Sequence, residues 1–305
     1  MRSLKGIVRP FYSLPSLCGV LLSLGLTACA GIAGNSQIDL TTLGNLSYQG
    51  IYDEPITLQK GRYEGKPFVP QGAAHPRVQL VEQLYIIADL DNDGVEEAAV
   101  FLTESSGGSG SYTYLAIVDK VEGQLQNVAT QKLGDRIQVR NLQFERGMLT
   151  LGMITAGPKE AACCATLKLH NTYRYRHGKL ELTASEQRGH VDLVDLQGRW
   201  TLTRLDRNEP LPAEVAVNIE FRDAQFSGLA GCNRYFGAIQ GKVPLDIVIG
   251  PIGATRMMCP PLIMQVEDHY LPALQQVKQF RFMFGQLALS YQDDKGWHTM
   301  LFKPQ

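Results

Sequence analysis

The sequence predicts a mainly β protein of the α+β type, in which a β-rich N-terminal domain precedes an antiparallel sheet with one helical segment. The chain has 305 residues, of which 44% are hydrophobic and 19% are charged, enough apolar material for one large or two ordinary domains. Most apolar residues alternate with polar ones in short runs that end at glycine turns, the pattern of β-hairpins. One patch near the C-terminus has the period of a helix instead.

Charge and hydropathy exclude two classes of protein. The formal net charge is −1, so the chain lacks the basic excess of a nucleic-acid-binding protein, and no nucleic-acid partner is expected. No apolar run reaches the roughly 18 residues that a membrane-spanning helix needs. The chain contains 30 glycines and 15 prolines, well below the share that indicates a disordered chain.

Residues 1–28 are predicted to be a signal peptide. The positive charges at the start are Arg2, Lys5 and Arg9. The apolar core that follows, residues 14–26, is too short to span a bilayer. It ends at Leu26-Thr27-Ala28-Cys29, which resembles the lipobox of bacterial lipoproteins. The resemblance implies cleavage before Cys29 and acylation of that cysteine by chains such as palmitate; an ordinary signal peptide with an incidental cysteine is the alternative.

Acyl chains on Cys29 would attach the mature protein to a membrane without a transmembrane helix, because each buried CH₂ contributes about 0.8 kcal/mol. Ala30 follows the cysteine, where an Asp would resemble the inner-membrane retention signal of enteric bacteria. Residues 29–38 are small and polar enough to act as a tether. We therefore expect a lipid-anchored lipoprotein on the outer membrane that faces the periplasm.

The cysteines fit an oxidising compartment. The chain has six, at 18, 29, 163, 164, 232 and 259. The first is removed with the signal peptide and the second is the lipid site, which leaves four cysteines and three possible pairings. We favour Cys232 with Cys259, because both fall in one domain, and Cys163 with Cys164 as a vicinal pair. Free adjacent thiols are the alternative for the second pair, and the spacing disfavours a zinc site.

Residues 39–190 are predicted to form the β-rich domain. Residues 112–118 are a β-rich apolar run, and apolar residues alternate on both sides of the turn at Arg146-Gly147. Further alternating runs flank the turn at His177-Gly178-Lys179. No amphipathic helix is expected here, and the polar residues 184–192 are interpreted as the link to the next domain.

Residues 195–305 are predicted to form the second domain. Alternation begins at Trp200 and recurs in strands up to Phe302. Between these strands, helical spacing relates Ile263, Val266, Tyr270, Leu274 and Val277. Pro272 lies inside this patch, so we expect a break or kink there, with two short helices as one outcome.

Three motifs of the second domain occur in a fixed order. They are Gly228-Leu229-Ala230-Gly231-Cys232-Asn233-Arg234-Tyr235-Phe236-Gly237, then Thr255-Arg256-Met257-Met258-Cys259-Pro260, then Glu267. Together they resemble the META domain, the family that includes the heat-shock protein HslJ. The residues that carry the motif are Gly231, Asn233, Gly237, Thr255, Met257, Pro260 and Glu267.

The META resemblance implies an antiparallel sheet with a helix and a non-enzymatic role in envelope or stress tolerance. The motif also fits simple physical chemistry. Gly231 and Gly237 permit a tight, bulged strand, and Asn233 can bond nearby backbone. A disulfide between Cys232 and Cys259 would join the strand to the start of the helix.

One acidic run could bind a metal ion. Residues 89–97 follow the pattern D-x-D-x-D-G-x-x-E, which places oxygens at alternating positions of a tight turn. The predicted calcium ligands are Asp89, Asp91, Asp93, the carbonyl of Val95, and Glu97. Position twelve of an EF-hand would fall on Val100, so the run instead resembles the acidic loops of FG-GAP-type β repeats. The alternative is a β-turn whose carboxylates bond their own backbone.

No other pattern indicates catalysis, and no catalytic residue is proposed. The string Gly107-Gly108-Ser109-Gly110-Ser111 lacks the context of a nucleophile elbow and is interpreted as a loop. The first hypothesis is therefore a non-enzymatic envelope protein that binds an unknown protein or small ligand. The second is an inhibitor-like or ligand-binding lipoprotein with a calcium-stabilised N-terminal domain. A metal-dependent hydrolase is the least favoured, because a carboxylate-only site suits structural calcium better than activated water.

Overall fold

The computed structural model describes residues 37–206, 209–241 and 245–305. The predicted signal peptide, Cys29 and most of the predicted tether lie outside these residues. Strands contain 56% of the residues and helices 10%, which confirms the mainly β fold class. Within the described residues, no helix is long and apolar enough to cross a membrane. The described residues belong to one compact unit.

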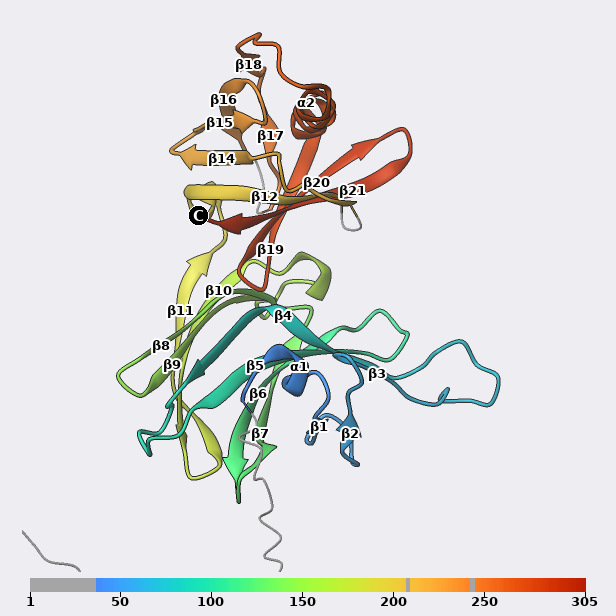
Figure 1. Cartoon of the computed structure of the whole chain (residues 1–305), viewed down its shortest axis with the longest axis vertical. Helices are drawn as coiled ribbons and strands as arrows, with labels where there is room; N and C mark the ends of the chain where they lie inside the picture. The colour runs from blue at the N-terminus through green and yellow to red at the C-terminus, as the bar shows by residue number, and fades with distance from the viewer. Residues whose placement is uncertain (1–36, 207–208, 242–244) are drawn as a thin grey trace, which may run out of the picture. The chain divides into compact units, whose positions relative to one another are not determined.

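The N-terminal half contains a five-stranded and a four-stranded sheet, both antiparallel (Figure 1). The first part comprises α1 (Leu40–Leu43), β1 (Ser47–Tyr48), β2 (Ile56–Thr57), β3 (Arg62–Glu64), β4 (Arg77–Ala88), β5 (Glu97–Ser105), β6 (Tyr112–Val121) and β7 (Gln124–Asp135). The second part comprises β8 (Gln138–Glu145), β9 (Met148–Thr155), the 3₁₀ turn η1 (Ala162–Cys164), β10 (Leu167–Arg176) and β11 (Lys179–His190).

The five-stranded sheet β3-β4-β5-β6-β7 is buried on both faces. One face contributes Phe101 and Ile117 to a core shared with Leu151 and Tyr175 of the sheet β8-β9-β10-β11. The other face packs against α1, β1 and β2 through residues such as Tyr48. Because both faces are covered, β5 is buried almost throughout, and its apolar residues 98–102 show no alternation.

Two local features of this half were not predicted. The short helix α1 was not predicted; its capping residue Asp39 accepts a hydrogen bond from the backbone N–H of Thr42 at 2.7 Å. The polar residues interpreted as a link mostly continue β11, which ends at His190. This strand is polar because it forms an exposed edge beside β10, so composition alone made it look like a linker.

The C-terminal half is built on a ten-stranded antiparallel sheet that forms a nearly closed barrel. Its elements are η2 (Leu193–Leu196), β12 (Gly198–Asp206), β13 (Glu209–Pro210), β14 (Val217–Arg222), β15 (Gln225–Ala230), β16 (Arg234–Gln240), β17 (Val248–Ile249), β18 (Gly253–Ala254), α2 (Pro261–Gln275), β19 (Val277–Met283), β20 (Gln286–Asp293) and β21 (Gly296–Pro304).

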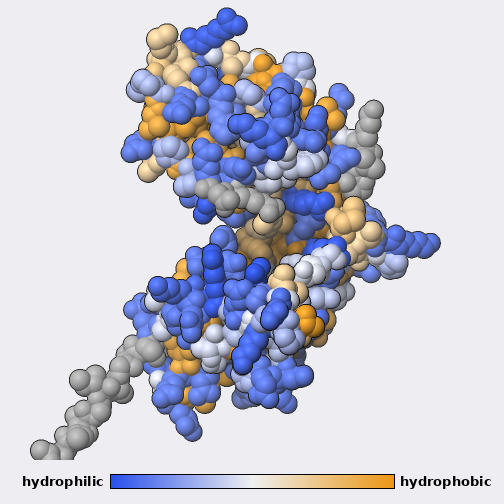
Figure 2. Space-filling view, turned by 90° about the vertical axis from the view of Figure 1, so that its right-hand side faces the viewer, coloured by the Kyte–Doolittle hydropathy of each residue, from blue (hydrophilic) through white to orange (hydrophobic). Residues whose placement is uncertain are grey.

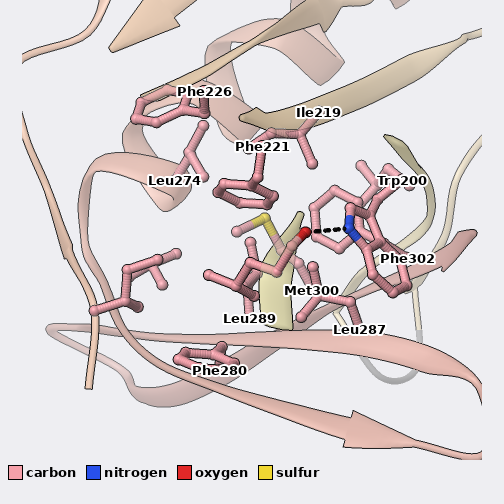
Figure 3. Close-up of a cluster of buried hydrophobic side chains, with 14 of the residues drawn as sticks. Trp200, Ile219, Phe221, Phe226, Leu274, Phe280, Leu287, Leu289, Met300 and Phe302 are labelled. Carbon is pink, nitrogen blue, oxygen red and sulfur yellow. Dashed lines mark hydrogen bonds between the residues drawn. The ribbon is translucent and has the colours of Figure 1, made fainter. Parts of the chain in front are cut away.

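Two hydrogen bonds close this barrel. The Ile247 N–H donates to the Lys278 carbonyl and the Phe280 N–H donates to the Leu245 carbonyl, both at 3.0 Å. The enclosed core is rich in aromatic rings (Figure 3). In it, Trp200 is anchored by a 2.9 Å hydrogen bond from its indole N–H to the Leu196 carbonyl.

The helix α2 differs from its prediction at the C-terminal end. It continues through Pro272 to Gln275 as one segment, so it does not divide into two helices. Pro272 lies in the last turn, where the missing N–H costs one hydrogen bond and leaves the preceding turns intact. The expected last helical position, Val277, is instead the buried first residue of β19. An apolar residue at this position fits the helical spacing as well as the alternation of a strand.

One glutamine connects the two halves of the compact unit. The Phe282 N–H of β19 donates to Gln138 Oε1 of β8 at 3.0 Å. The amide nitrogen of Gln138 donates to the Ala165 carbonyl at 3.5 Å. Ala165 and Ile154 of the N-terminal half also join the barrel core. The two halves therefore share buried side chains as well as hydrogen bonds.

Candidate metal centre

The acidic run forms the turn between β4 and β5. Asp89 folds back on this turn, because its Oδ1 accepts the Asp93 N–H and its Oδ2 accepts the Gly94 N–H, both at 3.1 Å. Asp93 Oδ1 accepts the Val95 N–H at 2.8 Å. Gly94 has a φ of 90°, a conformation that glycine adopts without strain. The self-bonded turn is thus present, and it also orients the carboxylates.

Three carboxylates converge at this turn. One oxygen each from Asp89, Asp91 and Glu97 lies within 4.8 Å of the other two. These are three of the five predicted ligands. Asp93 lies outside the cluster, because its side chain is turned back towards the Val95 N–H. The Val95 carbonyl stays a prediction.

Glu97 is the most confined member of this cluster. Its exposed fraction is only 1%. Its Oε2 accepts the Leu90 N–H at 2.7 Å. Among the described residues, however, the buried atoms Glu97 Oε1 and Asp91 Oδ1 have no hydrogen-bond partner. A buried carboxylate oxygen without a partner is costly, since it has lost water and gained nothing in return.

The electrostatics of the cluster reflect that cost. Burial raises the pKa of Glu97 to about 7, and the charges of Asp119, Asp91 and Asp93 act in the same direction. The hydrogen bond from the Leu90 N–H opposes them. A cation between these carboxylates would replace repulsion by attraction, and oxygen ligands of this kind suit Ca²⁺.

Asp119 and Tyr175 belong to the surroundings of this cluster and were not predicted. The Tyr175 hydroxyl of β10 donates to Asp119 Oδ2 of β6 at 2.7 Å. Ala98 pairs with Val118, so Glu97 and Asp119 follow at the same end of neighbouring strands. The only sequence signal was a lone Asp at the end of an apolar run, and its meaning depends on the strand register.

The META motif forms a second buried polar cluster, in the C-terminal half. Cys232 and Cys259 form the predicted disulfide, with their Cα atoms 6.0 Å apart. Beside it, Glu267 Oε2 accepts the Asn233 N–H at 2.7 Å and the Cys232 N–H at 3.3 Å. Glu267 Oε1 accepts the Asn233 side-chain amide at 2.7 Å. Both oxygens of this glutamate are therefore satisfied inside the protein.

Asn233 also forms hydrogen bonds with the segment that precedes α2. Its Oδ1 accepts the Met257 N–H at 2.6 Å and the Thr255 hydroxyl at 2.8 Å. Pro260 directly precedes α2. Gly231 has a φ of 107°, and a Cβ on Gly237 would overlap the Phe226 ring. The motif residues thus shape and hold the β15–β16 connection against the helix.

The motif also brings apolar side chains to the surface. Met258 is 95% exposed and Met257 is more than half exposed. On the face drawn in Figure 2, hydrophilic residues predominate and apolar groups lie among them.

The thiols of Cys163 and Cys164 in η1 are exposed. Both are free, with their Sγ atoms 2.8 Å apart. The predicted vicinal pairing therefore stays a prediction.

A nearly closed antiparallel barrel, one helix and a disulfide beside a buried Asn–Glu pair define the class of this C-terminal half. Residues 191–304 match the model of the META domain family, so the chain contains a META domain. An NMR structure of a protein from Burkholderia xenovorans is similar at 22% identity, over 37% of this chain and 85% of that one, with a TM-score of 0.30. None of the curated proteins matches the chain.

Proposed function

We propose that this chain is a lipid-anchored envelope protein without enzymatic activity, whose META domain serves a stress-related binding role and whose N-terminal domain is stabilised by calcium. The string that ends at Cys29 supports the anchor. The META domain supports the envelope and stress role. In cells, a Cys29→Ser variant should move from the membrane fraction to the soluble fraction; equal membrane retention would contradict the anchor.

The observation that carries the calcium proposal is the pair of buried, unpartnered oxygens on Asp91 and Glu97. A β-turn that only bonded its own backbone would not need to bury them. Asp89 contributes a third carboxylate oxygen within 4.8 Å, and water can complete the roughly six to eight ligands of calcium. Three carboxylates without a nitrogen or sulfur ligand favour a hard cation.

A thermal melt of the mature, unlipidated protein with calcium or with a chelator tests this site. Binding to the native state alone stabilises by about 2.7 kcal/mol at a hundredfold excess over Kd. Asp91→Asn should lose most of this gain, whereas Asp53→Asn, an exposed change in the same domain, should keep it. Equal melting temperatures with calcium and with chelator would show that the acidic run is a β-turn without a calcium site.

The alternative function, a ligand-binding lipoprotein, is favoured by one specific observation. A cavity of about 410 Å³ is lined by residues of both halves, a volume typical of small-molecule sites. This function would need a small ligand that occupies the cavity, and the residues that line it indicate its chemistry.

A further inference from the structure

The walls of the 410 Å³ cavity carry an excess of positive charge. The charged side chains in its lining are Arg140, Lys168, Arg188 and Asp195. Asp195 is paired with both Arg140 and Lys168, at 2.9 Å for the Lys168 Nζ. Arg188 pairs outside the lining, with Glu186 at 2.8 Å. One carboxylate therefore balances two cations.

Asp195 has little capacity left to attract further cations. It is nearly buried, and its Oδ2 also accepts the Asp192 N–H at 3.0 Å. The bases, by contrast, keep unused donors. An ammonium has three N–H groups and a guanidinium five, whereas Lys168 and Arg140 each direct two hydrogen bonds at Asp195. The remaining donors can bind an anion.

Two further side chains add to this capacity. Asn141 and His170 both line the cavity. Within the part of the chain that the structure describes, neither side chain makes a hydrogen bond. An amide N–H and an imidazole N–H are thus available beside the two cations.

The remaining wall is apolar and partly aromatic. It includes Trp200, Phe282, Met153 and Leu169. The Arg140 guanidinium lies 4.4 Å from the centre of the Phe282 ring, a cation–π contact that fixes its orientation. The Trp200 and Phe282 rings are 6.2 Å apart. Both rings are largely buried, with 8% of Trp200 and 2% of Phe282 exposed, so a small part of each ring is available beside the charged groups.

We propose that this cavity binds a small organic anion, whose carboxylate or phosphate contacts Arg140 and Lys168 and whose apolar body lies against Trp200 and Phe282. The residues involved are separate from the acidic cluster, so binding does not depend on calcium. Carboxylate and phosphate share the chemistry that guanidinium and ammonium groups recognise.

Tryptophan fluorescence gives a local test, because the chain has only two tryptophans. Trp200 lines the cavity, whereas Trp297 is 58% exposed and lies outside it. A Trp297→Phe background therefore leaves one reporter. We would titrate it with benzoate, phenyl phosphate, inorganic phosphate and uncharged benzyl alcohol, with and without chelator, and measure the same pairs by calorimetry.

Benzoate or phenyl phosphate should bind with a Kd of about 1 mM or below, and the stronger of the two identifies the preferred anion. Inorganic phosphate should bind more weakly and benzyl alcohol not at all. Added salt should weaken binding. Equal binding of benzyl alcohol, or no saturable binding of either aromatic anion, would overturn the proposal.

Lys168→Gln removes one cation while Arg140 still pairs with Asp195, so the fold should persist. It should weaken anion binding roughly tenfold, as expected for a hydrogen bond to a charged group. Arg176→Gln, an exposed change at the end of the same strand and outside the lining, is the matched control. Equal affinities of the two variants would show that the anion does not bind at Lys168.

Discussion

The two halves of the chain each bury a glutamate against a connection between strands, and they differ in how its oxygens are hydrogen-bonded. In the META domain, both oxygens of Glu267 accept hydrogen bonds from Asn233 and Cys232. In the N-terminal half, Glu97 accepts one bond from the Leu90 N–H, while its second oxygen has no partner among the described residues. Both side chains are almost fully buried, with 6% and 1% exposed.

Glu267 is therefore part of a complete network of hydrogen bonds, whereas Glu97 has an oxygen that is left to bind a cation. Glu267 is satisfied by groups of the chain itself, so it needs no ligand to be stable where it lies. Glu97 is surrounded by other carboxylates, which raise the cost of its charge. The first glutamate should therefore matter under all conditions, and the second should change its effect with the cation present.

The largest effect is expected at Glu267. Glu267→Ala leaves the Asn233 amide and two backbone N–H groups without their acceptor, and should lower the free energy of unfolding by about 3 kcal/mol. Urea unfolding measures this loss, which should be the same with calcium and with chelator. Asp268→Ala, an exposed neighbour on α2, should cost much less. If Glu267→Ala lowered the free energy of unfolding no more than Asp268→Ala, the hydrogen bonds of Glu267 would not stabilise the META domain.

Glu97→Gln should have opposite effects in the two conditions. With chelator, it removes a buried and repelled charge, so the protein should gain about 1 kcal/mol of stability. With calcium, it removes a ligand, so the calcium-induced rise in melting temperature should shrink or vanish. Glu96→Gln, an exposed change next to it, should leave both melts unaltered. The same sign of effect in both conditions would contradict the proposed cation site.

The same carboxylate should give the protein a pH dependence when calcium is absent. Because the pKa of Glu97 in the folded chain, about 7, exceeds its ordinary value of 4.5, the folded state binds more protons between these values. Stability from this group is therefore fully present below pH 4.5 and is lost as the pH rises towards 7, with a slope of at most about 1.4 kcal/mol per pH unit.

Urea unfolding of wild type and Glu97→Gln across this pH range isolates that slope. The difference between the two proteins should grow with pH when chelator is present. Saturating calcium should reverse the trend for wild type, because the cation binds the charged carboxylate. A pH-independent difference would mean that Glu97 titrates normally.

Sequence patterns predicted much of the C-terminal half, because the residues of the motif that resembles the META domain contact each other. Cys232 is joined to Cys259 by the disulfide, and both Cys232 and Asn233 are hydrogen-bonded to Glu267. The helix end was harder to predict, since Pro272 is tolerated in a last turn and Val277 fits either a helix or a strand.

The acidic cluster was predicted in part. Asp89, Asp91 and Glu97 were expected as ligands from their spacing, and the structure brings them together. Asp93 was included because alternation treats all three aspartates alike, although its side chain bonds the Val95 N–H. Asp119 and the cavity residues Arg140 and Lys168 come from separate strands, so no local pattern could group them.

The contact of Gln138 with β19 has a consequence for solubility. β19 is the last strand of the ten-stranded sheet, and Gln138 supplies an acceptor to its Phe282 N–H from outside that sheet. A fragment limited to residues 191–304 would lack this acceptor, and the Phe282 N–H would stay unpaired beyond the two hydrogen bonds that close the barrel. An unpaired N–H on an edge strand can bond a strand of another molecule, so the N-terminal half also reduces the tendency of the barrel to self-associate.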